Sequence, residues 1–178
     1  MRKEKSWFGF FFFWVLVNTV GWLAFSVSNF YVALSAVGLL IAWLQFLVLK
    51  RYFELDDLAW IWLSFLLYGA VYALLISESQ IKNVGFIFVG MVIFFGLIGY
   101  LQRRSLRYCL RNDSFWLVAS PLAGCTGLFA AIVAINLYSN PPHGMFEVVF
   151  GCVYGSITGI IILLADKLPM KKATTTPE

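Results

Sequence analysis

Six long stretches of this chain carry no charged side chain, and each has the length that one helix needs to cross a lipid bilayer. They span residues 7–27, 30–49, 58–77, 84–101, 115–137 and 148–165. A helix of about 20 residues crosses a hydrocarbon core of about 30 Å. We therefore expect an all-α membrane protein with six transmembrane helices in a single domain over residues 1–170, followed by a flexible cytoplasmic tail over residues 171–178.

The positively charged residues fall almost entirely on one side of the predicted bundle. Of the 13 Lys and Arg residues, 12 lie in the two terminal tails and in the second and fourth connections, and the exception is Lys82 in the third connection. Short loops that are rich in Lys and Arg stay in the cytoplasm. Both termini are therefore predicted to be cytoplasmic, and the net charge of +4 is explained by this topology and by attraction to anionic lipid.

The second and third predicted helices form a pattern that the fourth and fifth repeat 56 to 57 residues later. In each copy a Gln precedes a basic residue by five positions, and a Trp in the following helix precedes a Ser by four. The matched residues are Gln45, Lys50, Trp60 and Ser64 in the first copy and Gln102, Arg107, Trp116 and Ser120 in the second. Because the copies are two helices apart, they share one orientation, and we expect repeated helical hairpins.

The two ends of the chain carry the halves of a third copy. The predicted arrangement is therefore a ring of three helix pairs, closed by contact between the first and sixth helices. A stripe of glycines at helical spacing lets another backbone approach closely, which predicts helix packing within the chain, with dimerisation and ligand access as the alternatives. The residues concerned are Trp14, Asn18 and Gly21 in the first helix and Gly151, Gly155 and Gly159 in the last.

Five uncharged polar residues in the predicted spans form the candidate site. Each is costly to expose to lipid, so each is expected to bond another helix or to line a watered cavity. The first interpretation is hydrogen bonding between helices, and the second is a pocket for a small molecule. Asn18 is expected at mid-membrane. The other four are expected near the cytoplasmic ends of their helices, and they are Gln45, Ser64, Gln102 and Ser120.

Several kinds of chemistry find no support in the sequence. No Asp, Glu, Lys, Arg or His lies in a predicted span, whereas proton-coupled transporters, pumps and voltage sensors place ionisable groups there. His143 is the only histidine, and the three cysteines lack metal-ligand spacing. Neither a phosphate-binding loop nor a nucleophile with a base partner is found. We therefore expect no enzymatic activity, no metal, no cofactor and no nucleic-acid partner.

Two segments carry a resemblance to a known group of proteins. The segment Gln45-Phe46-Leu47-Val48-Leu49-Lys50 joins Gln, an aromatic residue, apolar residues and a cation, and 102–107 keeps the ends of this pattern but not its apolar middle. With the glycine-rich last helix over 151–159, these motifs resemble uncharacterised bacterial, often cyanobacterial, multi-span membrane proteins with repeated Gln/Arg and Trp/Ser/Gly helix pairs. The resemblance implies that the protein lies in a bacterial inner membrane, or in a thylakoid membrane if the source is a cyanobacterium. It does not point to any particular activity.

Two functions fit these features. The first is a non-enzymatic integral membrane scaffold or an accessory subunit of a membrane complex, which follows from the small size, the lack of charge in the spans and the glycine packing faces. The alternative is a small-ligand carrier or a substrate-binding membrane subunit of a transporter, because six helices in 178 residues also resemble the vitamin-capturing subunits of energy-coupling transporters. The expected partners are the lipid bilayer and either a membrane protein complex or a second copy of the chain.

Overall fold

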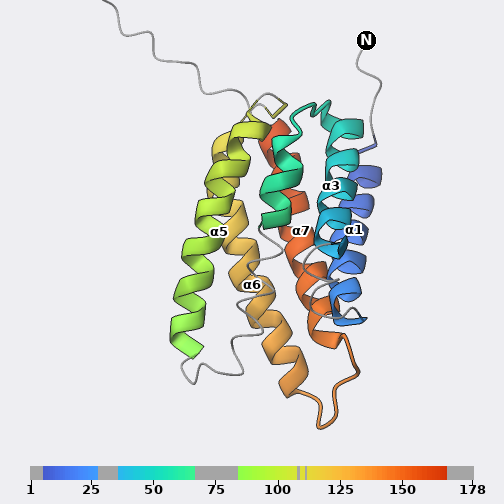
Figure 1. Cartoon of the computed structure of the whole chain (residues 1–178), viewed down its shortest axis with the longest axis vertical. Helices are drawn as coiled ribbons and strands as arrows, with labels where there is room; N and C mark the ends of the chain where they lie inside the picture. The colour runs from blue at the N-terminus through green and yellow to red at the C-terminus, as the bar shows by residue number, and fades with distance from the viewer. Residues whose placement is uncertain (1–5, 28–35, 67–83, 108, 111, 168–178) are drawn as a thin grey trace, which may run out of the picture.

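The computed structural model describes residues 6–27, 36–66, 84–107, 109–110 and 112–167. All regular structure in these ranges is helical, which confirms the expected all-α class. The long helices lie side by side along the longest axis of the molecule (Figure 1). The elements are α1 (Trp7–Val27), α3 (Gly38–Phe53), a helix over 59–66, α5 (Val84–Leu106), the 3-10 helix η3 (Asp113–Phe115), α6 (Trp116–Asn136) and α7 (Met145–Lys167).

Three segments of the described chain are long and apolar enough to cross a membrane, namely Trp7–Ala24, Asp113–Asn136 and Met145–Lys167. They correspond to the first, fifth and sixth predicted spans. α5 covers the fourth predicted span and continues beyond it. The second and third predicted spans include residues 30–35 and 67–77, which lie outside the described residues.

Two helices run further than the sequence predicted. α3 ends at Phe53 instead of residue 49, and α5 ends at Leu106 instead of residue 101. Both extensions carry basic residues in the last turn, where a cation interacts favourably with the C-terminal end of a helix. Treating charged residues as the end of a span therefore placed these two helix ends too early. α3 stops at Glu54, which adopts a left-handed backbone conformation with φ of 61°.

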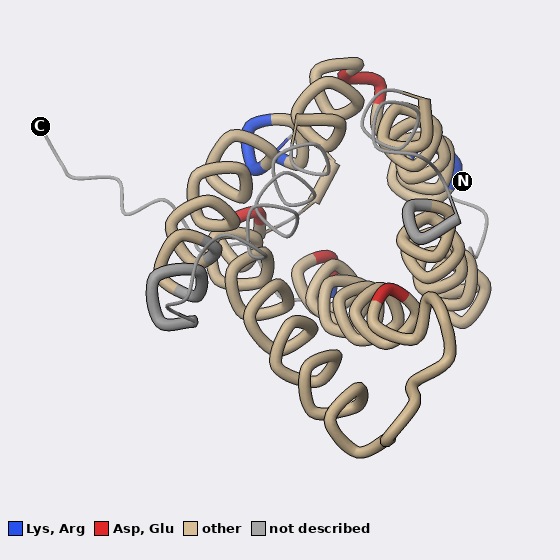
Figure 2. The backbone as a smooth tube through the Cα atoms, turned by 60° about the horizontal axis from the view of Figure 1, so that its bottom comes forward, with Lys and Arg blue, Asp and Glu red and all other residues tan. Residues whose placement is uncertain are grey.

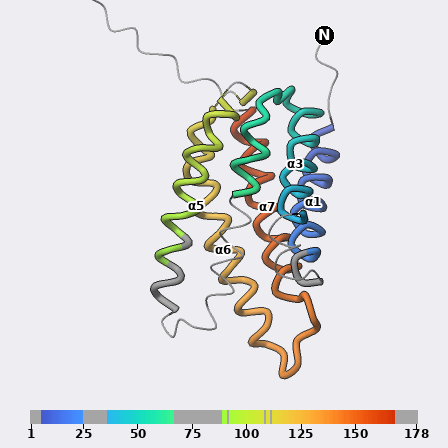
Figure 3. Tube along the Cα trace, in the orientation of Figure 1, coloured from blue at the N-terminus to red at the C-terminus, as the bar shows by residue number. Residues whose placement is uncertain are grey.

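One end of the bundle carries nearly all the charged residues of the described chain (Figure 2). The 54–58 and 107–115 connections lie there with the start of α1 and the end of α7, whereas the α6–α7 connection lies at the opposite end (Figure 3). The two ends of the described chain meet there, because Lys167 Nζ lies 4.8 Å from the centroid of the Trp7 ring. We call it the basic end, defined by Lys50, Arg51, Arg103, Arg104, Arg107 and Lys167.

The predicted contact between the first and last helices is confirmed. A Cβ added at Gly151 would lie 2.7 Å from the carbonyl oxygen of Asn18, and one added at Gly155 would lie 3.0 Å from the Asn18 Cβ. One added at Gly159 would lie 3.0 Å from the Trp14 ring. Side chains at these positions would separate α7 from α1. The three glycines therefore allow α7 to approach α1 closely.

Buried side chains form two clusters that follow one another along the bundle. The cluster nearer the basic end includes Trp14, Trp60 and Trp116. The cluster nearer the opposite end includes Phe150 and Tyr154. The buried polar residues lie among these apolar groups, so each of them needs a hydrogen-bond partner inside the bundle.

Candidate functional site

Three tryptophans from different helices meet inside the bundle. Trp14 comes from α1, Trp60 from the 59–66 helix and Trp116 from the first position of α6, and each is at most 2% exposed. The ring centroids of Trp14 and Trp60 are 6.4 Å apart, and those of Trp60 and Trp116 are 5.7 Å apart. The sequence repeat thus brings its three equivalent indoles together. The polar residues four positions further on, Asn18, Ser64 and Ser120, are all fully buried.

Asn18 and Gln45 join α1 to α3. The side-chain nitrogen of Gln45 donates to Asn18 Oδ1 over 2.8 Å. The side-chain nitrogen of Asn18 in turn donates to the carbonyl oxygen of Trp14, one turn earlier in α1, over 2.8 Å. Both amides are buried, so these bonds fix their orientation.

Gln102 makes the equivalent bond in the second copy of the repeat and adds another. Its side-chain nitrogen donates to Ser64 Oγ over 2.8 Å. Its side-chain oxygen accepts a hydrogen bond from Trp116 Nε1 over 3.2 Å. One amide therefore links α5 to the 59–66 helix on one side and to α6 on the other.

Thr158 on α7 takes the same acceptor role toward Trp14 as Gln102 takes toward Trp116. The indole nitrogen of Trp14 donates to Thr158 Oγ1 over 2.9 Å, as Trp116 does to Gln102. The Thr158 hydroxyl donates to the carbonyl oxygen of Tyr154, one turn earlier, over 2.7 Å. The interior hydrogen bonds therefore follow the sequence repeat from one helix to the next, through the pair formed by the two ends of the chain.

Trp60 and Ser120 each place a buried polar atom outside this network. Trp60 Nε1 and Ser120 Oγ each lack a partner with hydrogen-bond geometry. Ser120 packs against Gly99, where an added Cβ would lie 2.8 Å from the Ser120 Cβ. The Tyr154 hydroxyl interacts with Ser120 electrostatically, although the two oxygens do not meet the geometry of a hydrogen bond.

Of the five predicted site residues, four form the bonded pairs Gln45–Asn18 and Gln102–Ser64. The bond between Gln45 and Asn18 places these two residues at one level of the bundle, although the sequence assigned them different depths. Ser120 is buried as expected but is not bonded to the other four.

Asp57 stabilises the start of the 59–66 helix at the basic end. Its Oδ1 accepts a hydrogen bond from the backbone N–H of Ala59 over 2.9 Å, as an N-capping carboxylate does. Its Oδ2 accepts a hydrogen bond from the Ser105 hydroxyl over 2.6 Å. The same carboxylate therefore caps one helix and holds the end of α5.

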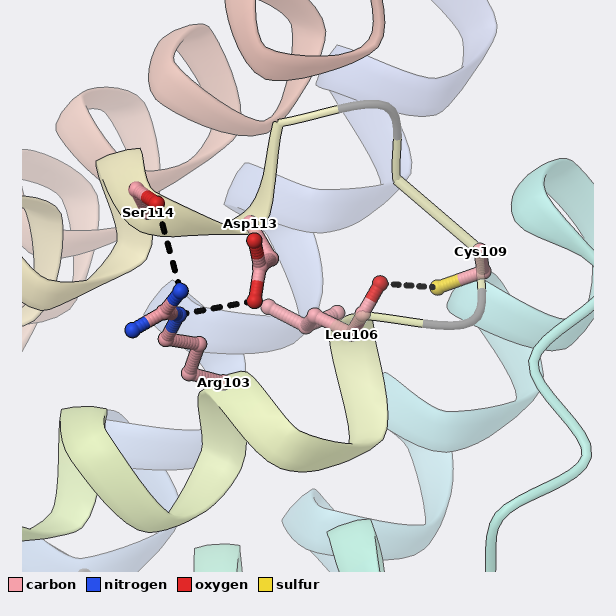
Figure 4. A network of polar contacts seen from close by, with 5 residues as sticks. All are labelled: Arg103, Leu106, Cys109, Asp113 and Ser114. Carbon is pink, nitrogen blue, oxygen red and sulfur yellow. Dashed lines mark hydrogen bonds and ion pairs between the residues drawn. The ribbon is translucent and has the colours of Figure 1, made fainter. Parts of the chain in front are cut away.

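Asp113 holds the end of α5 from the other side. Arg103 Nε lies 2.7 Å from Asp113 Oδ2 in an ion pair, and Arg103 also donates to Ser114 Oγ over 3.3 Å (Figure 4). Asp57 and Asp113 each precede a Trp of the repeat by three residues. This Asp-x-x-Trp spacing was present in the sequence and went unused in the prediction of the site.

Cys109 lies in the connection between α5 and η3 and is partly buried. Its Sγ lies 3.4 Å from the carbonyl oxygen of Leu106 (Figure 4). Burial, reinforced by the nearby Asp166 carboxylate, raises the pKa of the Cys109 thiol to about 12. The thiol is therefore protonated at neutral pH and is a poor nucleophile.

An apolar cavity of about 240 Å³ lies between α1 and α3. None of the predicted polar residues lines it, and several of its lining side chains are exposed on the outside of the bundle. The cavity therefore offers apolar contact without a directed hydrogen bond. Its lining consists of Leu16, Val17, Val20, Gly21, Ala24, Val37, Leu40, Ile41 and Leu44.

Among the described residues, no three His, Cys, Asp or Glu side chains gather where they could hold a metal ion. Sequence reasoning also missed Thr158 as a site residue, although it accepts a hydrogen bond from a Trp of the repeat, as Gln102 does. Comparison of the chain with protein-family models, with curated proteins and with solved structures gave no match.

Proposed function

We propose that this chain is a six-span integral membrane protein that serves as a non-enzymatic scaffold or accessory subunit of a membrane complex. The observation that supports this proposal is that the interior polar side chains form hydrogen bonds between helices. Gln45, Asn18, Gln102 and Ser64 bond one another across helices, and none of them lines the apolar cavity. A ligand pocket needs a few polar groups that converge on the ligand, whereas these groups hold helices together.

The outer surface suits a protein that works through contacts in the membrane. Large apolar side chains project from the sides of the bundle, and Trp62, Leu66, Val118 and Phe129 are each more than half exposed. Lipid tails or the helices of a partner would cover such side chains. The basic end would face the cytoplasm, because connections rich in Lys and Arg are retained there.

Purification of the tagged, full-length protein from its native membrane tests this proposal. Mass spectrometry of the purified material is expected to find one or more membrane proteins in a fixed ratio to the chain. Recovery of the chain alone, without a protein partner, would contradict the proposal. Recovery of the chain alone with one small molecule in a fixed ratio would favour the carrier function instead.

The proposed orientation has its own test. In a variant that lacks the three native cysteines, a single cysteine at His143, in the α6–α7 connection, is expected to react in intact cells with a thiol reagent that does not cross membranes. A single cysteine at Asp56, at the basic end, is expected to react only after the membrane is opened. Reaction of the Asp56→Cys variant in intact cells would reject the orientation.

The cavity between α1 and α3 favours a small-ligand carrier as the second candidate. Its volume of about 240 Å³ is just below that of typical ligand sites, about 300–1,000 Å³, and its apolar lining would suit a small lipophilic molecule. Val20→Trp would fill it, so a co-purified ligand that occupies it should be lost. Val118→Trp, on an exposed face of α6, is the matched control and should retain the ligand.

A further inference from the structure

Trp60 differs from the two equivalent tryptophans in the use of its indole N–H group. Trp14 donates to Thr158 and Trp116 donates to Gln102, but Trp60 Nε1, in a side chain that is only 1% exposed, has no hydrogen-bond partner in the described structure. A buried donor without an acceptor costs about 1–3 kcal/mol. Unsatisfied buried groups of this kind call for an explanation.

The repeat identifies the acceptor that Trp60 would use. Gln45 corresponds to Gln102, and both donate from the side-chain nitrogen to the polar residue four positions after a Trp. Gln102 also accepts from the Trp that follows it, whereas Trp60 makes no such bond to Gln45.

The difference coincides with the length and shape of the two connections. Trp60 follows Gln45 by 15 residues, and Trp116 follows Gln102 by 14. The shorter path enters α6 through η3, whereas the longer path leaves α3 through the left-handed Glu54. The two indoles therefore hold equivalent places in the repeat but are reached through connections of different length and shape.

We propose that one buried water molecule binds at Trp60 and bridges its indole N–H to the side-chain oxygen of Gln45. Water accepts from an indole donor and still has two hydrogens to donate, and an amide oxygen has two lone pairs and can accept more than one hydrogen bond. Buried waters of this kind make about three hydrogen bonds to polar groups that would otherwise be unsatisfied. The rings of Trp14 and Trp116 pack against Trp60, which favours an acceptor of the size of water over an organic ligand.

Nuclear magnetic resonance of the full-length protein labelled with ¹⁵N at the tryptophan indoles tests this assignment. Single Trp→Phe variants assign the resonances. The Trp60 indole proton is expected to show a cross-peak to a long-lived water, and the Trp14 and Trp116 indole protons are expected to show none. Gln45→Leu should abolish the Trp60 cross-peak. Gln102→Leu is the matched control, and it should shift the Trp116 resonance while leaving the Trp60 cross-peak unchanged.

Absence of the water cross-peak at Trp60 in the unaltered protein would overturn the proposal, and so would its persistence at full intensity in Gln45→Leu. A cross-peak to an organic molecule instead would also overturn it. Because Gln45→Leu can fail to fold, a high-resolution experimental structure of the unaltered protein gives a second reading. A water within hydrogen-bond distance of both Trp60 Nε1 and the Gln45 oxygen is expected there, and a direct Trp60–Gln45 bond would refute the bridge. Neither reading depends on the proposed scaffold function.

Discussion

Trp14 and Thr158 are 144 residues apart in the chain and are joined by a buried hydrogen bond of 2.9 Å. This bond ties α1 to α7 in the same way as the bond between Trp116 and Gln102 ties α6 to α5. The two ends of the chain thus form a helix pair equivalent to the pairs within it. No connection links this pair, so its stability rests on the side-chain contacts of α1 and α7.

Thr158→Val tests the contribution of this bond. The change keeps the shape of the side chain and leaves the Trp14 indole N–H buried without an acceptor. Hydrogen bonds between membrane helices are worth about 0.6 kcal/mol on average and up to about 1.7 kcal/mol, so the free energy of unfolding should fall by an amount in this range. Thr126→Val, on the exposed side of α6, is the control. Equal effects of the two changes in a reversible unfolding assay would contradict the role of Thr158.

Gly151→Ala should disrupt the α1–α7 contact. The new methyl group would lie 2.7 Å from the Asn18 carbonyl oxygen and 2.9 Å from the Thr19 Cα, and these backbone atoms move only if α1 moves. Overpacking of this kind costs about 1–3 kcal/mol, so the melting temperature should fall clearly. Gly96→Ala is the matched control, because an added Cβ there meets nothing within 4 Å. It should be neutral, or stabilising by up to about 1 kcal/mol. A melting temperature for Gly151→Ala equal to that of the unaltered protein would show that α7 does not pack on α1 through this face.

Asp57→Ala should weaken the basic end. It removes the cap on the Ala59 N–H and the acceptor of the Ser105 hydroxyl, and loss of an N-cap alone costs about 1 kcal/mol. Asp56→Ala is the control, because the Asp56 side chain is 80% exposed and its ion pair with Lys50 is of a kind worth about 0–1 kcal/mol. Thermal unfolding should therefore separate the two variants, with Asp57→Ala melting lower. The reverse order would argue against the capping role.

Cys109 should react slowly with a water-soluble maleimide, and its reaction rate should keep rising at pH values where the rate of an ordinary cysteine has levelled off. With a thiol pKa of about 12, the thiolate fraction keeps rising above pH 9, so the rate should continue to increase there instead of levelling off. At pH 8 the folded protein, with Cys125 and Cys152 replaced by Ala, should react roughly 10- to 100-fold more slowly than the same chain unfolded in detergent, because lower thiolate content outweighs the higher intrinsic nucleophilicity. A rate that levels off near pH 9 would contradict burial of this thiol.

The sequence predicted the architecture well where an uncharged apolar run sets the limits of a helix or where glycines set a contact between helices. The first helix begins and ends at the predicted residues, Trp7 and Val27, because an uncharged apolar run is bounded by polar positions. The contact between α1 and α7 could be predicted because Gly151 and Gly155 leave room for a backbone whatever the rotamers of their neighbours.

The details of the site could not be predicted in the same way. The bonds of Gln45 and Gln102 depend on how neighbouring helices are aligned along the bundle, which the pattern of charged and apolar residues does not determine. The difference between Trp60 and Trp116 could not be predicted, because the two hold the same place in the pattern of polar and apolar residues and differ only in their hydrogen bonds. Thr158 was missed because a sequence comparison does not match a Thr to a Gln, although both can accept the same hydrogen bond.

The pairing of α1 with α7 also sets an order of assembly. The ribosome makes α1 first and α7 last, so the indole N–H of Trp14 has no access to Thr158 until nearly the whole chain has been synthesised. Until then the face of α1 that packs on α7 stays uncovered and is available to other molecules. A chain that stops before residue 145 contains no α7, so it cannot form the bond between Trp14 and Thr158 and leaves the packing face of α1 uncovered.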